Sequence, residues 1–298
     1  MKIHQETHAT FSKNASFLKK IFPQDDEKYY YGFLNHDPLF SPRTIFSMKN
    51  QEQIVATLWY LPRLFLDGER ILTAAGIANV ATDPEFRGQG LAARLMERAL
   101  KEAEIQPADF LILVTEIPKY YEKWGFQEMG KYHAIIKPEH STNRASIEPV
   151  AHKNILDIYE AFYRHFHLIV PFRNMAYMTG MMEWNQWSLL FNTHEEKSKW
   201  WQFIVDSGDS VIVYGMDRGE HFEIFEILWG ETTDTKRVVS ILHGLAYQLG
   251  KEVYISLPLT IINILDLEIH KNPKNTVMVR AYRDIDLQRI YIPVPDYF

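Results

Sequence analysis

Apolar positions along the first half of the chain follow two periods, which predict strands and helices in turn. Runs rich in β-branched and aromatic residues predict strands at 44–48, 53–65, 70–82, 110–114 and 126–136. Helical spacing of apolar residues predicts helices at 12–22, with Ser12 as the cap, and at 28–35, 91–101 and 118–124. Pro62 is expected to break the second strand, and Gly76 to mark a bulge in the third.

The second half of the chain repeats this order of elements. Strands are expected at 146–149, 200–206, 210–216, 221–229, 252–256 and 276–282. Helices are expected at 154–165, 175–187 and 235–249, the last closed by Gly250. A polar, turn-rich segment from Pro138 to Arg144 separates the halves. We therefore predict a mixed α/β protein with one domain over residues 1–140 and a second over 145–298.

Composition narrows the class of protein. The chain has 298 residues, of which 46% are hydrophobic, enough for two packed cores. A net charge of −6 without a block of Lys and Arg argues against nucleic acid as a partner. The chain has no cysteine, which excludes thiolate chemistry and is typical of the cytoplasm, where we expect the protein. No apolar run approaches the roughly 20 residues that span a bilayer, so no membrane partner is expected.

The junction between the third predicted strand and the long helix has the pattern of an anion site. The sequence Arg87-Gly88-Gln89-Gly90 leads directly into that helix. The first N–H groups of a helix have no intrahelical partner, and the helix dipole adds positive potential there. The glycines leave these amides open to a phosphate group, and Arg87 adds a positive charge. The spacing matches neither a dinucleotide fingerprint nor a P-loop, and a plain glycine-rich turn is the alternative.

Two motifs on these elements resemble those of the GNAT superfamily of N-acetyltransferases. The first is Arg-x-x-Gly-x-Ala at 87–92, directly after a strand that ends in Val-Ala-Thr at 80–82, and it is similar to the acetyl-CoA signature. The second is Tyr-x-x-x-Gly-Phe at 121–126. The resemblance covers about residues 40–137. It implies direct transfer of an acetyl group from acetyl-CoA to a primary amine, with no covalent enzyme intermediate and no metal.

The resemblance also implies where the coenzyme binds. The strands ending at Thr82 and Thr115 should run parallel and then splay apart, so that the backbone of the first pairs with the pantetheine. The pyrophosphate should lie on the amides at the start of the helix, and an N–H near Val80 should stabilise the oxyanion. The coenzyme residues implied are Val80, Ala81, Thr82, Arg87, Gly88, Gln89, Gly90, Leu91, Ala92, Ala93 and Thr115.

The same resemblance assigns the catalytic roles. Tyr121 is in the superfamily position of the general acid that protonates the departing thiolate, and Tyr120 is the neighbouring alternative. The general base is left open between Glu116, the C-terminal carboxylate at Phe298 and a water molecule. Asp25, Asp26 and Tyr30 are expected to contact a cationic acceptor, although an acidic start of a solvated helix is the alternative.

Within the superfamily, the arrangement resembles the enhanced-intracellular-survival family, in which a catalytic N-terminal GNAT domain precedes a second, cofactor-free one. At the corresponding place in the second half, residues 229–236 carry one glycine with Glu231 and Asp234 nearby, which should repel a pyrophosphate. That family's third, sterol-carrier-like domain is expected to be missing here. The expected acceptor is a small molecule, a peptide or an aminoglycoside-like amine, and the sequence leaves the oligomeric state open, with a homo-oligomer as one possibility.

Two other readings of the function stay open. The chain could bind acyl-CoA as a sensor or scaffold without turnover. Catalysis could also lie in the second half, as in tandem enzymes such as mycothiol synthase, although the acidic residues at 229–236 argue against it. The spacing of His4 and His8 suits a metal on a helix, but no third ligand lies near in the sequence, so chance is the better explanation.

Overall fold

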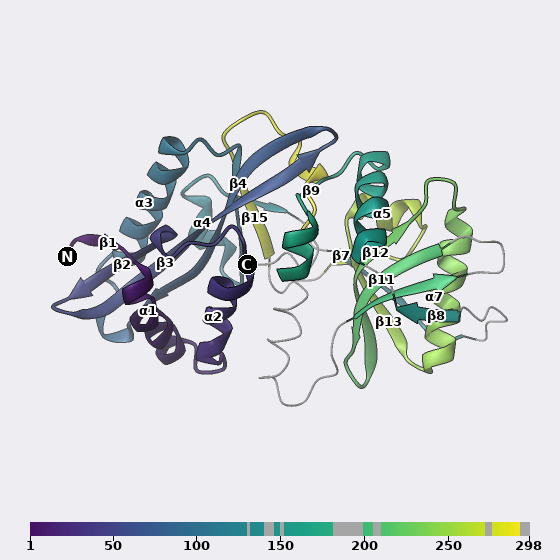
Figure 1. Ribbon diagram of the computed structural model, residues 1–298, viewed down its shortest axis with the longest axis horizontal. Coiled ribbons are helices and arrows are strands. Elements are labelled where there is room, and N and C mark those ends of the chain that lie inside the picture. Colours follow the sequence, from purple (N-terminus) through teal and green to yellow (C-terminus); the bar gives the residue numbers. More distant parts are fainter. Residues whose placement is uncertain are drawn as a thin grey trace.

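Two mixed β-sheets with helices on their faces make up the protein (Figure 1). The computed structural model describes residues 1–129, 132–139, 146–149, 152–180, 199–204, 210–271 and 276–292. The α/β class with two sheets confirms the predicted fold class. The boundary expected at residues 140–145 lies outside the described residues.

The first sheet has the strand order β1-β2-β3-β4-β5-β15-β6, and β9 pairs with β3. Its strands are β1 (Ile3–Gln5), β2 (Ile45–Asn50), β3 (Gln53–Asp67), β4 (Arg70–Thr82), β5 (Phe110–Thr115), β6 (Gln127–Met129), β9 (Ile169–Pro171) and β15 (Thr276–Ala281). The expected break at Pro62 is wrong, because Pro62 pairs with Ala75 inside a continuous hairpin. Pairing with β2 has ended at Trp59 and pairing with β9 begins only at Phe65, so the missing N–H of Pro62 faces an unpaired edge.

The second sheet repeats this order. It runs β8-β10-β11-β12-β13-β7-β14. Its strands are β7 (Tyr132–Ile136), β8 (Ser146–Pro149), β10 (Lys199–Ile204), β11 (Ser210–Asp217), β12 (His221–Trp229), β13 (Glu252–Leu257) and β14 (His270–Lys271). In both sheets an antiparallel run leads to one parallel pair, β4 with β5 in the first and β12 with β13 in the second.

The two halves of the chain exchange a strand. The sequence predicts one strand over 126–136 in the first domain, and this is wrong, because β6 joins the first sheet and β7 pairs with β13 of the second. The strand expected at 276–282 in the second domain is β15, which lies between β5 and β6 of the first sheet. Strand propensity is a local property, whereas the choice of sheet depends on packing between distant segments.

Helices cover both faces of the first sheet (Figure 1). Its helices are α1 (His8–Ile21), α2 (Glu27–His36), α3 (Leu91–Ile105), α4 (Pro118–Glu122) and the 3₁₀ turns η1 (Pro42–Thr44) and η2 (Pro84–Phe86). Leu95 of α3 packs on Leu111 and Leu113 of β5, whereas α1 and α2 pack on the opposite face around Trp59. The N-cap of α1 is Thr7, whose N–H donates to Oγ1 of Thr10 at 2.9 Å, so the expected cap at Ser12 is wrong.

The second sheet carries its own helices and a buried link to the first. Its helices are α5 (His152–His165), α7 (Thr235–Leu249) and α8 (Leu259–Ile264), whereas the later 3₁₀ turn η3 (Leu287–Arg289) packs through Leu287 on the first sheet. Arg173 lies just after β9, and its Nη1 atom is 2.8 Å from Oε2 of Glu226 in β12. Both side chains are fully buried. The segment that adds β9 to the first sheet is therefore anchored by an ion pair in the core of the second.

Candidate active site

The parallel strands β4 and β5 separate toward their C-terminal ends. Their described ladder joins Ala74 to Phe110, Ala75 to Leu111 and Gly76 to Ile112. Both strands continue beyond these pairs, β4 for six residues to Thr82 and β5 for three to Thr115. The resulting opening is the splay that the sequence motifs imply. It exposes unpaired backbone of β4 to any extended ligand that enters it.

A bulge in β4 lies at this opening. The register with β3 moves from Trp59 opposite Ala78 to Thr57 opposite Ala81, so Asn79 and Val80 face a single residue of β3. Asn79 has a φ of 50°, in the left-handed region that Asn tolerates better than most residues. The extra residue of a bulge is left out of the regular ladder of backbone hydrogen bonds. The bulge therefore favours main-chain N–H groups near Val80 that are open to a ligand.

The bulge is displaced from its expected place. The sequence predicts it at Gly76, and this is wrong, because Gly76 pairs regularly with Leu61 on one side and Ile112 on the other. A signal was present in the sequence. Asn is depleted in strands and enriched at left-handed positions, so Asn79 marks the irregular residue better than a glycine does.

The loop before α3 presents free backbone amides. Gly90 is the N-cap of α3, and no side chain accepts a hydrogen bond at this cap. Gly88 and Gly90 have φ values of 77° and 72°, and a Cβ atom at either position would meet no other atom within 4 Å. Residues 87–90 are exposed. Uncapped amides, the helix dipole and open space above both glycines fit a pyrophosphate group.

Polar contacts hold this loop in place. Asp83 begins η2 by accepting a hydrogen bond from the N–H of Glu85 at 3.1 Å. Its other oxygen accepts one from Nζ of Lys20 at 2.7 Å, and this bond lowers the pKa of Asp83. Lys20 lies at the end of α1, so the contact joins that helix to the end of β4. Arg87 folds back toward the same point, where its Nε is 3.4 Å from the carbonyl oxygen of Thr82.

The equivalent helix start in the second sheet is different. Asp234 is the N-cap of α7, and its side chain accepts a hydrogen bond from the N–H of Lys236 at 3.0 Å. A carboxylate therefore already occupies the place where an anion would bind, and Glu231 is close by in the sequence. This contrast supports the first sheet as the coenzyme side.

Tyr121 of α4 lies on the face of the first sheet that α3 covers. Its side chain is 7% exposed and belongs to the cluster formed by α3, β5 and Met278 of β15. Burial raises the pKa of Tyr121 to about 12, with a smaller contribution from Tyr120, whose ring lies at 5.0 Å. The phenol therefore keeps its proton at neutral pH, as a general acid must. Tyr120 is less buried, and its pKa is also raised.

Two contacts fix α4 at its ends. Oγ1 of Thr115 accepts a hydrogen bond from the N–H of Ile117 at 3.0 Å, which turns the chain from β5 into the helix. Nη1 of Arg280 in β15 donates to the carbonyl oxygen of Trp124 at 2.6 Å, just beyond the helix. Sequence reasoning missed Arg280, because it placed this strand in the other domain.

The residues predicted to contact the acceptor have mostly structural roles. Tyr30 is fully buried, and its hydroxyl donates to Asp25 at 2.8 Å, so its contact with an acceptor stays a prediction. Asp26 caps α2 by accepting a hydrogen bond from the N–H of Lys28. Glu116 is exposed just beyond β5, and Phe298 lies outside the described residues. The side chain of Tyr30 is part of the apolar cluster around Trp59, whereas its acidic neighbours in the sequence had suggested a contact with the acceptor.

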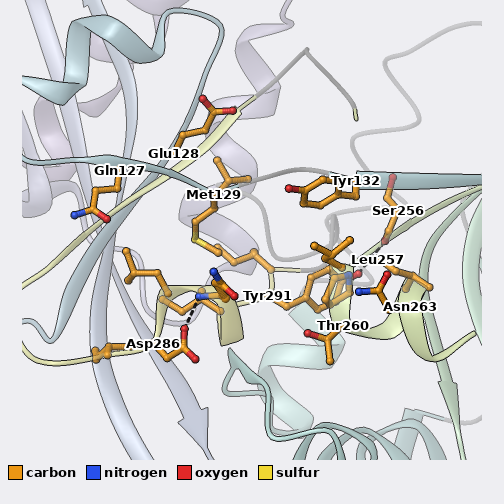
Figure 2. A pocket seen from close by; sticks show the side chains of 18 residues that line it. Gln127, Glu128, Met129, Tyr132, Ser256, Leu257, Thr260, Asn263, Asp286 and Tyr291 are labelled. Atoms are coloured by element: carbon orange, nitrogen blue, oxygen red, sulfur yellow. Dashed lines mark hydrogen bonds between the residues drawn. The ribbon is translucent and has the colours of Figure 1, made fainter. Parts of the chain in front are cut away.

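A cavity of about 690 Å³ lies where the two sheets meet (Figure 2). One wall comes from β6, β15 and the segment around η3, and the other from β7, β13 and the start of α8. Met129 and Val277 line the first wall, and Ser256 and Asn263 line the second. The sequence analysis did not anticipate this cavity, because both walls depend on the exchanged strands.

The described residues contain neither a membrane-spanning helix nor a metal-binding cluster. No helix there is long and apolar enough to cross a membrane. No group of three or more histidine, aspartate and glutamate side chains there is placed to hold a metal ion. His4 lies in β1 and His8 begins α1, so the two do not share a helix face.

Comparisons with known proteins agree with this geometry. Residues 2–129 match the family model of the acetyltransferase (GNAT) domain. A probable N-acyltransferase from Enterococcus faecalis is 15% identical at a TM-score of 0.68, with 94% of this chain and 72% of that one covered. A GCN5-related N-acetyltransferase from Anabaena variabilis is 17% identical at a TM-score of 0.68, with 95% of this chain and 73% of that one covered. Eis1 from Mycobacterium abscessus is 10% identical at a TM-score of 0.60, with 94% of this chain and 74% of that one covered. No curated protein matches the sequence. Residues 2–129 are therefore a GNAT acetyltransferase domain, and the chain has the fold of the GCN5-related N-acetyltransferases.

Proposed function

We propose that the protein transfers an acetyl group from acetyl-CoA directly to a primary amine at the opening between β4 and β5. The observation that carries the proposal is the combination of splayed parallel strands with the uncapped, glycine-lined start of α3. The strand backbone offers hydrogen bonds to the amides of pantetheine, and the helix start offers them to the pyrophosphate.

Different groups of the chain would then stabilise the oxyanion and protonate the leaving thiolate. Main-chain N–H groups at the β4 bulge, near Val80, stabilise the negative charge that forms on the carbonyl oxygen when the amine attacks. Tyr121 donates its proton to the sulfur of the departing CoA thiolate. Its buried hydroxyl stays protonated because its pKa is raised to about 12. The acceptor amine approaches from the face opposite α3.

The general base remains open among three candidates. Glu116 lies just past β5 and is exposed. A water molecule and the C-terminal carboxylate of Phe298 are the other two. Removing the carboxylate with Glu116→Gln should lower kcat and raise the apparent pKa of the amine-dependent rate if Glu116 is the base.

The experiment that tests the proposal follows the release of free CoA from acetyl-CoA with a panel of primary amines. Tyr121→Phe should lower kcat about 10²-fold or more, since general acid catalysis contributes roughly 10²–10⁴-fold. The affinity for CoA should be unchanged, because the ring remains in the apolar cluster. Tyr120→Phe is the matched control on the same helix and should change kcat little.

An acyl-CoA sensor without turnover is the second candidate function. It would be favoured if CoA binds with a defined stoichiometry while no amine in the panel releases free CoA. Equal kcat values for the wild type and Tyr121→Phe would contradict the role of Tyr121 as general acid, but they would not contradict the proposed coenzyme site.

A further inference from the structure

The cavity where the two sheets meet lies on the acceptor side of the first sheet. Side chains along β5 alternate between its faces, so that Leu111 and Leu113 contact the α3 cluster. Val114 points to the opposite face and packs in another cluster with Val277 of β15. Val277 lines the cavity, whereas its neighbour Met278 belongs to the α3 side. A molecule in the cavity therefore approaches the opening from the face opposite the coenzyme loop.

The strand register fixes how far the cavity is from the opening. Val277 pairs with Val114 of β5 on one side and with Met129 of β6 on the other. Neighbouring strands are about 4.8 Å apart, so the cavity wall at Met129 is about 10 Å from β5. An extended molecule of that length reaches from the cavity to the separated strand ends.

The lining selects the chemistry of an occupant. Asp286 contributes a carboxylate at the rim, and no described lining residue is Lys, Arg or His. Glu128 pairs with Met278 and so directs its side chain to the α3 side. Asp286 uses one oxygen to accept a hydrogen bond from the N–H of Gln288 at 3.0 Å (Figure 2). Met129 and Leu257 supply apolar wall. The cavity of about 690 Å³ is within the usual range of small-molecule sites, and its charge favours cations over anions.

Polar side chains also point into the space. Figure 2 shows the hydroxyl of Tyr132 directed toward Met129, and the amide of Asn263 directed toward the same space from α8. Both residues come from the second sheet and its helices. The second half of the chain therefore supplies hydrogen-bonding groups to a space that borders the chemistry of the first.

We propose that this cavity holds the body of the acceptor, which is an amphipathic amine carrying a second cationic group about 10 Å from the amine that is acetylated. The apolar chain of the acceptor lies along Met129 and Leu257, and the distal cation lies near Asp286. This inference rests on the proposed function and adds the class of acceptor to it.

Three amines of equal chain length test the proposal: octane-1,8-diamine, octylamine and 8-aminooctanoate. They present a cation, a methyl group or an anion at the distal end. Binding is measured by calorimetry in the presence of CoA, and turnover by release of free CoA from acetyl-CoA. The diamine should bind at least tenfold more tightly than octylamine, and 8-aminooctanoate should bind most weakly.

Two variants place the selectivity in the cavity. Asp286→Asn removes the charge and keeps the side-chain cap of η3, because Asn also caps helices. It should weaken diamine binding about three- to tenfold and leave octylamine binding unchanged. Asn263→Lys adds a cation at an exposed position of α8 and should weaken diamine binding further. Glu69→Gln, in the exposed turn after β3, removes a carboxylate far from the cavity lining and should change neither.

The outcomes separate the two proposals. Equal binding of the three amines, or diamine binding that neither cavity variant changes, overturns the cavity assignment. If the diamine binds with the expected selectivity but no free CoA is released, the cavity stands as a site for cationic amines and the proposed acetyl transfer fails. If amines are acetylated without any preference for the diamine, acetyl transfer stands and the cavity assignment fails.

Discussion

The most direct test of the coenzyme site replaces Gly90, the N-cap of α3, with Ala, Glu and Lys. All three variants place a Cβ atom at a φ of 72°, which costs about 1–2 kcal/mol of stability for a residue other than glycine. No atom lies within 4 Å of the added Cβ, so the variants share this backbone cost without a clash. They differ in the charge that they bring to the helix start.

The magnitude of the charge effect follows from Coulomb's law. A carboxylate about 6 Å from a pyrophosphate with about two negative charges is repelled by about 1.4 kcal/mol in bulk water and about 5.5 kcal/mol at an effective dielectric constant of about 20. Gly90→Glu should therefore raise the Kd for CoA by at least about tenfold relative to Gly90→Ala. Gly90→Lys should bind CoA at least as tightly as Gly90→Ala, because its charge has the opposite sign.

Calorimetric titration with CoA at low and high salt measures these differences, and circular dichroism verifies that each variant is folded. The gap between Gly90→Glu and Gly90→Lys should narrow as salt screens the charges. Equal Kd values for folded Gly90→Glu and Gly90→Ala at low salt would mean that the pyrophosphate binds elsewhere, and the site at the start of α3 would have to be abandoned.

Three further predictions concern catalysis and stability. With the pKa of Tyr121 raised to about 12 by burial, its acid form persists through alkaline pH, so kcat should decline only as the pH approaches 12; a decline centred near 10 in a pH-rate profile would contradict this. Arg280→Met, which removes the hydrogen bond to Trp124, should lower kcat about tenfold at unchanged affinity for CoA, with partial recovery in Arg280→Lys. Glu226→Leu should cost about 3–5 kcal/mol in urea unfolding, because it strands the buried charge of Arg173, and adding Arg173→Met should recover much of the loss; an additive double variant would refute this.

Local signals in the sequence predicted the strand and the helix that flank the opening between β4 and β5. The strand over Arg70–Thr82 and the helix from Leu91 have the expected bounds at those positions, because their apolar periods and turn residues are local signals. The glycines before α3 predict an anion site because the first amides of a helix have no intrahelical partner and glycine leaves them open to a ligand. Tyr30 shows the limit of this reasoning, since the burial of this α2 side chain depends on Trp59 from a distant strand.

The sequence by itself determined the longer strands and helices of both halves and the motifs within residues 2–129, which match a GNAT domain. The short elements β1, β9, α8 and β14 were not predicted. Only the tertiary structure decided that β7 and β15 cross between the sheets, and that the cavity between them is built from both halves. The physical reason is that a strand's pattern records which of its faces is buried, but not which distant edge completes its hydrogen bonds. That choice is made by the packing of both sheets together.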